Sequence, residues 1–518
     1  MILTDNCLNT TLVEYGDYQT PVPFVRRVCK KLSSFYKLHP MNIIEPTFGI
    51  GNFLEGIIDV FNDTCTIYGI EINKEYCNIA EQRINSNLSL KSRVKLYNSN
   101  VFAFDFNDIK DSLSPKDQLL IIGNPPWITN SQLASIGSDN LPKKSNFKGH
   151  SGFDAMTGKG NFDVSEYIIL KLLSEFANFD CILAMLCKTV VAKNIVRDIG
   201  KYDFSISSID LFTFNATEIF NVSCDAGLLV VRLGKPNIQT CSVYNFNTNE
   251  KIKEFGWVDN AFYSNTQTIN GRSEIDGSCQ LTWRQGIKHD CSKVMELVID
   301  ENGFFKNGLG DTHCFQIASY VYPLLKSSDI RTHEITGTRK YVIVTQKRVG
   351  EDTSKIKRQD IIIWEYLQKH ESYLAARRSS IYKNAPKYAI FGVGDYSFSN
   401  YKVGISGFYK EPIFAVIVGN TPILMDDTCY FLSFSKVEDA YITLALLNSS
   451  VCITFLKTIA FLDSKRPYTK DILQRIDLHK LYKLMNYDYV RDFVSNLPSR
   501  FILTKLDYDN YLRNEKVV

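Results

Sequence analysis

Short apolar runs recur along the first 235 residues and alternate with stretches of helical character. Runs of this length are typical of buried strands. Strands that alternate with helices predict an α/β fold with a doubly wound, mostly parallel sheet. Only a loop separates the last two runs, so we expect the final strand to insert antiparallel. The expected strands are 42–45, 65–71, 94–97, 119–122, 181–186, 206–211 and 227–233, and the expected helices include 23–36, 74–85 and 165–176.

The pattern changes after residue 236. The rest of the chain contains aromatic-rich, β-prone stretches, isolated glycines and, later, helices, without an internal repeat or a low-complexity tract. We therefore predict two domains, 1–236 and 237–518, the second of the α+β class. No apolar run is long enough to span a bilayer, and the first twenty residues lack the pattern of a signal peptide. A cytoplasmic location is expected.

Composition excludes little else. The 13 cysteines include no Cys-x-x-Cys pair, which favours reduced, buried thiols over a zinc knuckle or a redox motif. The formal net charge is +3, and this value neither demands nor excludes a nucleic-acid partner, because binding needs only a local basic surface. No His/Cys/Asp cluster has metal-ligand spacing, and we expect no metal.

A glycine-containing turn follows the first strand, in the segment from Glu45-Pro46 through Gly49 and Gly51 to Phe53. Glycine lets the backbone approach a ligand closely at the carboxyl end of a strand. The turn lacks Gly-x-Gly-x-x-Gly spacing, so by itself it also fits an ordinary strand–helix connection. Glu71 ends the next strand, where a carboxylate can accept both hydroxyls of a ribose; a helix-capping carboxylate is the alternative. Together, the two motifs favour a nucleoside site.

The sequence Asn124-Pro125-Pro126-Trp127 ends the fourth strand. Two successive prolines stiffen the backbone and offer carbonyl acceptors but no N–H donors. The Asn124 side chain and the Pro125 carbonyl can therefore accept both N–H groups of an aromatic amine and localise its lone pair, while Trp127 stacks on the ring. An ordinary Pro-Pro loop with a core tryptophan is the alternative.

These motifs resemble the amino-group DNA methyltransferases of restriction-modification systems. Their order also matters: a Tyr18-Gln19-Thr20-Pro21 segment comes first, then the glycine turn, Asn-Pro-Pro-Trp and a long variable region. This order resembles the gamma arrangement of type II N6-adenine enzymes, over about residues 14–235. The resemblance implies a seven-stranded methyltransferase sheet in 1–236, S-adenosylmethionine as cofactor, and target recognition in 237–518.

The resemblance also implies roles for individual residues. The methionine end of the cofactor would lie by Thr20, Glu45, Pro46, Gly49 and Gly51, and its ribose by Glu71. Its adenine would contact Ile72, Asn100 and Val101, although the family often has an acidic residue where Asn100 stands. Phe220 resembles the aromatic that stacks on the target base opposite Trp127, and a core phenylalanine is the alternative.

Double-stranded DNA is the expected partner, with the target adenine flipped out of the duplex. The protein would act as a monomer and protect DNA from a separate restriction endonuclease. Basic residues that could contact phosphates are Lys143, Lys144 and Lys148 after the catalytic turn, and Lys347, Arg348, Lys465 and Arg466 in the second domain. Solvated surface charge is the alternative for each group.

Three other functions remain open from the sequence. The same turn serves methylation of cytosine N4, of RNA bases, or of a glutamine amide in a protein. A non-catalytic specificity protein with a degenerate methyltransferase fold is a further alternative. The intact Asn124, Glu71 and glycine turn argue against a degenerate site, and about 280 additional residues favour a module that reads duplex DNA.

Overall fold

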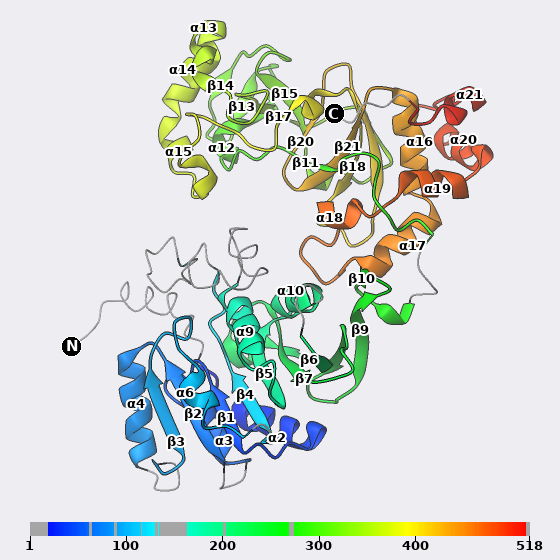
Figure 1. The fold of residues 1–518 in the computed structure, drawn as a ribbon. Helices are drawn as coiled ribbons and strands as arrows, with labels where there is room; N and C mark the ends of the chain where they lie inside the picture. Colours follow the sequence, from blue (N-terminus) through cyan, green and yellow to red (C-terminus); the bar gives the residue numbers. More distant parts are fainter. Residues whose placement is uncertain are drawn as a thin grey trace. The chain divides into compact units, whose positions relative to one another are not determined.

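The computed structural model describes residues 19–61, 65–86, 91–114, 117–129, 133, 163–199, 204–268 and 274–513. The chain folds as two compact units, Met1–Thr268 and Ile269–Val518 (Figure 1). The boundary after residue 268 therefore lies 32 residues beyond the predicted boundary at 236. The strands between these two positions belong to the first unit, because they extend its sheet.

The described residues of the first unit form one ten-stranded sheet, in the order β3-β2-β1-β4-β5-β7-β6-β8-β9-β10. The strands from β3 to β5 pair in parallel. Strand β7 runs antiparallel between β5 and β6, as predicted for the final strand. The strands are β1 Asn42–Glu45, β2 Thr66–Glu71, β3 Val94–Asn98, β4 Leu119–Gly123, β5 Cys181–Lys188, β6 Ile206–Asn215, β7 Asp225–Leu233, β8 Thr240–Asn245, β9 Lys251–Val258 and β10 Ala261–Tyr263.

The prediction of seven strands is thus right for β1 to β7 and wrong for the size of the sheet. Strand β8 pairs in parallel with β6, and β9 and β10 continue the sheet antiparallel. The first seven strands contain apolar runs because most of them are buried on both faces. Strand β9 is largely exposed over its first residues, so its sequence lacks that signal.

Helices cover both faces of this sheet. Alternate strand residues such as Ile43, Ile122 and Ala184 share one core with α2 and α3, as the two-residue period of a strand requires. The other face of β5 packs against α9 and α10 (Figure 1). The helices are α2 Val22–Tyr36, α3 Asn52–Ile58, α4 Lys74–Asn85, α6 Asn107–Lys110, α9 Val164–Glu175, α10 Thr189–Ile199 and α11 Ala216–Phe220.

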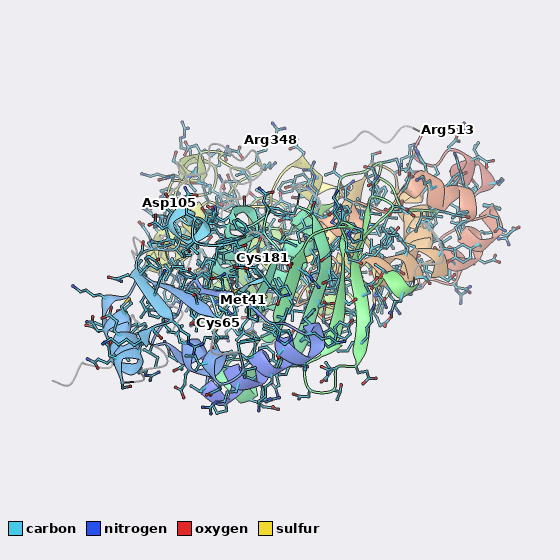
Figure 2. The ribbon with its side chains drawn as sticks, turned by 60° about the horizontal axis from the view of Figure 1, so that its bottom comes forward. Met41, Cys65, Asp105, Cys181, Arg348 and Arg513 are labelled. Carbon is cyan, nitrogen blue, oxygen red and sulfur yellow. The ribbon has the colours of Figure 1, made fainter. Side chains whose placement is uncertain are left out.

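Parallel pairing places the carboxyl ends of β1, β2 and β4 at one edge of the sheet. Met41 and Cys65, labelled in Figure 2, precede β1 and β2 and mark the opposite edge. The Thr66 N–H donates to the Met41 carbonyl over 2.9 Å there. The motifs that follow Glu45, Glu71 and Gly123 therefore converge on one side of the first unit.

The second unit contains two smaller sheets and helices. In its described residues the sheets have the orders β11-β21-β18-β19-β16 and β14-β13-β12-β17-β15-β20. The strands are β11 Arg284–Gln285, β12 Glu296–Ile299, β13 Phe305–Asn307, β14 Thr312–His313, β15 Val321–Leu325, β16 Glu334–Ile335, β17 Lys340–Ile343, β18 Tyr401–Ser406, β19 Phe414–Val418, β20 Leu424–Met425 and β21 Cys429–Phe434. The helices are α12 Ser292–Met295, α13 Ile356–Gln359, α14 Ile361–Lys369, α15 Glu371–Ala375, α16 Val437–Leu447, α17 Ser450–Ile459, α18 Lys470–Leu473, α19 Leu478–Leu484, α20 Tyr487–Ser495 and α21 Lys505–Asp509.

Among the described residues, no single helix is long and apolar enough to cross a membrane. The pair α16 and α17 passes the same test of length and composition when taken together, with a bend of 64° between the helices. Nine residues of α16 are buried inside the second unit, so its apolar character is that of a core helix.

Candidate active site

A pocket opens at the carboxyl edge of the first sheet. It contains about 780 Å³ of empty space, part of it open to solvent. Its walls come from the segments that follow β1, β2, β3 and β4, together with residues of α9. The lining residues are Gln19, Thr20, Glu45, Pro46, Thr47, Phe48, Gly49, Asn52, Phe53, Glu71, Ile72, Tyr76, Ser99, Asn100, Val101, Phe102, Asn124, Pro126, Val164 and Ile168.

Glu45 ends β1 and is only 1% exposed. Within the described part of the chain, no donor reaches its Oε2 atom. Burial raises the pKa of this carboxyl well above its usual value, and the neighbouring charge of Glu71 raises it further. A buried carboxylate without a donor is costly. Glu45 is therefore suited to accept a hydrogen bond from a cationic group that enters the pocket.

Glu71 ends β2 and is held by two backbone donors. The Gly49 N–H donates to Oε2 over 2.9 Å, and the Asn73 N–H donates to Oε1 over 2.8 Å. Each carboxylate oxygen has a further lone pair. Gly49 has a φ of +56°, and a Cβ at this position would meet the Gln19 side chain at 3.0 Å. The glycine therefore lets the turn donate to Glu71 while keeping the pocket open.

The segment after β3 closes another wall of the pocket. The Asn100 Oδ1 atom accepts the Phe102 N–H over 2.9 Å, so this oxygen helps to hold the turn in place. Ile72 and Val101 add apolar surface to the same pocket. Asn100, Val101 and Ile72 thus lie together, although the sequence predicted Asn100 as an acceptor for a ligand and not as a support for its own turn.

Asn124 follows β4 directly and is half-buried. Its Nδ2 atom donates to the Thr20 Oγ1 over 3.2 Å, which turns the carboxamide oxygen away from Thr20. Asn52 donates to the Thr20 carbonyl over 3.0 Å. Thr20 therefore joins the helix that follows the glycine turn to the Asn-Pro-Pro-Trp segment. Asn52 was not among the predicted site residues, and an asparagine directly after the second glycine was the available signal.

Four predicted residues do not line this pocket: Gly51, Pro125, Trp127 and Phe220. Gly51 has a φ of +88° at the start of α3, and a Cβ there would meet Ala80 of α4 at 3.4 Å. Gly51 thus allows the turn before α3 and the close packing of α3 against α4.

Trp127 and Phe220 contact each other. Their ring centroids are 5.2 Å apart at an interplanar angle of 67°, and both side chains belong to the main core. The indole N–H of Trp127 donates to the Leu186 carbonyl over 3.3 Å. The expected arrangement, with a base between these two rings, is not the arrangement in this structure, because an edge-to-face contact at this distance leaves no room for a third ring.

A charged pair supports the Asn-Pro-Pro-Trp segment from β5. The Lys188 Nζ atom donates to the Trp127 carbonyl and to Asp163 Oδ2, each over 2.8 Å. Asp163 also accepts the Ser165 N–H at the start of α9. Neither residue of this pair was among the predicted site residues. The available signal was a lysine at the end of an otherwise apolar strand.

The predicted DNA contacts have different surroundings. Lys143, Lys144 and Lys148 lie outside the described residues. Lys347 is exposed, and Arg348, labelled in Figure 2, is 73% exposed and pairs with Asp395 over 2.6 Å. Lys465 is exposed, whereas Arg466 is half-buried and donates to the Asp427 carbonyl over 3.1 Å. Lys347 and Lys465 are therefore more available to a partner than the two arginines.

Comparison with known proteins places the chain in a family. No family model matches the sequence. The type II methyltransferase M.NspV of a Nostoc species is 38% identical over 480 residues, which cover 92% of this chain and 98% of that protein. Among solved structures, the type IIL restriction-modification enzyme MmeI in complex with DNA gives a TM-score of 0.48 at 14% identity, over 90% of this chain and 66% of that one. A type I restriction-modification methyltransferase subunit from Streptococcus thermophilus gives 0.33 at 13% identity, over 50% and 53%. On its identity to M.NspV across nearly the full length of both chains, the protein belongs to the type II methyltransferases.

Proposed function

We propose that this protein transfers a methyl group from S-adenosylmethionine to the N6 amine of an adenine at a specific site in duplex DNA. One observation carries the proposal. Asn124, the first residue of the Asn-Pro-Pro-Trp segment, lines the same pocket as the buried carboxylates of Glu45 and Glu71. This arrangement supports a site for a cationic nucleoside beside a site for an aromatic amine.

The residues present fit the cofactor. Glu45 Oε2, which has no donor among the described residues, would accept the ammonium group of the methionine moiety. Glu71 has both oxygens fixed by backbone N–H groups and would accept the ribose hydroxyls through its remaining lone pairs. Ile72 and Val101 would contact the adenine. When bound, S-adenosylmethionine supplies an activated methyl group on a sulfonium.

Asn124 and Pro125 would orient the target amine. The Asn124 carboxamide donates through its nitrogen to Thr20, and its oxygen would accept one N–H of the exocyclic amine. The Pro125 carbonyl would accept the second N–H. Together they make the nitrogen more tetrahedral and align its lone pair, so the main contribution is orientation. The proton that the amine loses can pass to water after transfer.

Trp127 would stack on the flipped base from one side. Its backbone carbonyl is held by Lys188 and its indole N–H by the Leu186 carbonyl, so the ring has a fixed position before the base arrives. Phe220 contacts the indole edge-to-face and would support this position. Stacking by Phe220 on the other side of the base requires the two rings to separate.

The second unit would recognise the DNA sequence. The first unit has 25 lysines and arginines against 28 acidic residues, a net charge of −3, while the second has 34 against 28, a net charge of +6. DNA attracts basic surfaces and repels acidic ones. This asymmetry supports a division in which the second unit binds phosphates and base edges. A separate endonuclease would cut the unmethylated site.

Product analysis tests the proposal. The purified full chain is incubated with unmethylated plasmid and labelled S-adenosylmethionine, and the digested nucleosides are identified by mass spectrometry. N6-methyladenine is the expected product, and N4-methylcytosine or labelled RNA or protein would contradict the target assignment. Single-molecule sequencing of the plasmid then identifies the site. Labelled adenines scattered without a common sequence would contradict site-specific action.

A further inference from the structure

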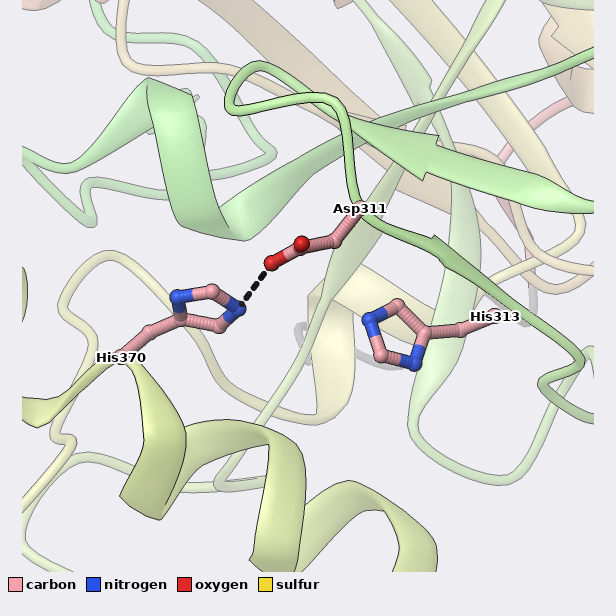
Figure 3. A group of neighbouring side chains, drawn as sticks. All are labelled: Asp311, His313 and His370. Carbon is pink, nitrogen blue, oxygen red and sulfur yellow. Dashed lines mark ion pairs between the residues drawn. The ribbon is translucent and has the colours of Figure 1, made fainter.

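Two histidines and an aspartate meet inside the second unit, at a position that the sequence did not indicate. Asp311 and His313 lie on the hairpin from β13 to β14, whereas His370 lies 57 residues beyond His313, between α14 and α15. Their ligand atoms all lie within 4.8 Å of one another. Figure 3 shows the two imidazole rings on either side of the Asp311 carboxylate, each with a ring nitrogen turned toward the space between them. The sequence showed no cluster with metal-ligand spacing, because folding and not sequence spacing brings Asp311 and His370 together.

The surroundings hold these side chains in place. The His370 Nε2 atom lies 3.0 Å from Asp311 Oδ2. The His313 ring stacks on Phe315 at 5.1 Å and meets Tyr366 edge-to-face at 4.8 Å. The Nε2 atom of His313 is buried and has no hydrogen-bond partner among the described residues. A buried imidazole nitrogen that aims at a carboxylate without bonding to it has the chemistry of a metal ligand.

A second layer of hydrogen bonds fixes the loop that carries Asp311. The Asn307 Oδ1 atom accepts the Asp311 N–H over 3.0 Å, and its Nδ2 atom donates to the Tyr366 hydroxyl over 2.9 Å. Tyr366 in turn donates to the Val294 carbonyl over 2.6 Å. Outer hydrogen bonds of this kind orient the side chains that bind a metal.

A lysine shares the carboxylate of this cluster. Lys369 and His370 both lie beside the Asp311 Oδ2 atom. Lys369 lies 3.1 Å from Asp311, and its side chain is 59% exposed. It can therefore swing into solvent when a cation takes its place.

We propose that Asp311, His313 and His370 bind one zinc ion, or a similar first-row divalent metal, with water as a further ligand. Two imidazoles and one carboxylate are a zinc ligand set. Ligand atoms on tetrahedral zinc are about 3.4 Å apart, so the most distant pair has to close by no more than about 1.4 Å, which side-chain rotation can supply. The ion would join the β13–β14 hairpin to the α14–α15 segment. It has a structural role and takes no part in methyl transfer.

Binding to the full chain tests the site. Protein stripped with EDTA is titrated with zinc chloride by calorimetry, and its thermal unfolding is followed with and without the metal. We expect one equivalent of tight binding and a higher Tm, and no comparable binding of magnesium, which prefers oxygen ligands. His313→Ala should lower the zinc affinity by about 100-fold or more, beyond the 10–100-fold typical of second-layer changes. His479→Ala, at an exposed histidine, and Cys314→Ser, at an exposed thiol beside the cluster, should leave the affinity unchanged.

Crystals soaked in zinc chloride give an answer that does not depend on the stability of a variant. An anomalous peak within about 2.2 Å of the three ligand atoms would support the site. A peak elsewhere, no peak, or an affinity that His313→Ala leaves unchanged would overturn it. Because the readouts are binding and diffraction, the result is independent of the methylation assay.

Discussion

Two buried glutamates, one in each unit, have opposite surroundings. Glu45 is 1% exposed, and burial and Glu71 raise its pKa. Glu296 is 6% exposed, and burial alone would raise its pKa, but hydrogen bonds from Lys326 and Lys340 lower it overall. Each lysine nitrogen lies 2.6 Å from a carboxylate oxygen. Glu296 is thus paired with cations inside its unit, whereas no ion pair involves Glu45 among the described residues.

This difference indicates different roles for the two carboxylates, one in stability and one in ligand binding. A carboxylate that is paired inside the fold stabilises that fold, whereas one left without a cation is available to a ligand that brings its own charge. The net charges of the two units show the same contrast: the first unit, which contains Glu45, carries −3, and the second carries +6. Substitutions in each unit test this contrast.

The largest expected effect is on turnover. Asn124→Ala should lower kcat by about 10²–10³-fold, because it removes a hydrogen bond that matters most in the transition state. Binding of S-adenosylmethionine, measured by calorimetry, should stay within about 2-fold, since Glu45 and Glu71 are unchanged. If cofactor binding fell as far as turnover did, Asn124 would belong to the cofactor site.

The glutamates themselves give a matched pair. Glu45→Gln should weaken cofactor binding by about 10–100-fold, the effect of losing a hydrogen bond to a charged group, without lowering the stability of the free protein. Glu296→Gln should leave cofactor affinity unchanged and lower the free energy of unfolding by about 2 kcal/mol, because two partly exposed lysines lose their partner. Calorimetry and urea unfolding of both variants check this. The same behaviour from the two variants would remove the contrast between the units.

The raised pKa of Glu45 also predicts a pH dependence. In the free protein its stabilising contribution is greatest below its unfolded pKa and is lost as the pH rises through the higher folded pKa. A bound ammonium group favours the ionised form, so cofactor affinity should fall up to about tenfold per pH unit below the folded pKa. Calorimetry in buffers of different ionisation enthalpy would detect the proton released on binding. The Glu45→Gln variant should show neither effect.

Lys188 should have a smaller effect on the same reaction. Lys188→Met removes the donor that holds the Trp127 carbonyl and pairs with Asp163, so the indole should lose its fixed position. We expect kcat to fall about 10-fold with cofactor affinity unchanged, since an indirect contact contributes less than a direct one. Lys188→Arg should recover part of the activity. A variant with normal kcat would show that the position of Trp127 does not depend on this pair.

The smallest expected effect lies in the second unit. Lys465→Ala should weaken DNA binding by about 3-fold and reduce the slope of log affinity against log salt by about 1, the signature of one phosphate contact. Gel-shift titrations at several salt concentrations measure both, with Lys436→Ala as a control for a general loss of positive charge. An unchanged slope would remove Lys465 from the DNA-binding surface.

The sequence predicted most of the first unit because its signals are local. Glu45 and Glu71 end apolar strands and Asn124 directly follows one, and parallel pairing brings such ends together. Asn52 and Lys188 act through contacts between distant segments, so their local signals did not indicate their roles. The second unit has short strands and cross-linked polar groups. The meeting of Asp311 and His370 there depends on tertiary packing, which a single sequence does not reveal.

Thr20 has a consequence for the order in which substrates bind. Its carbonyl accepts from Asn52 beside the proposed cofactor site, and its hydroxyl accepts from Asn124 beside the proposed target site. Thr20 is therefore hydrogen-bonded to one residue beside each proposed site. Any movement of Thr20 on binding one of them changes the affinity for the other, and thermodynamic reciprocity requires the same factor in both directions. The factor by which DNA changes the affinity for the cofactor should thus equal the factor by which the cofactor changes the affinity for DNA. Thr20→Ala should bring this coupling factor toward one.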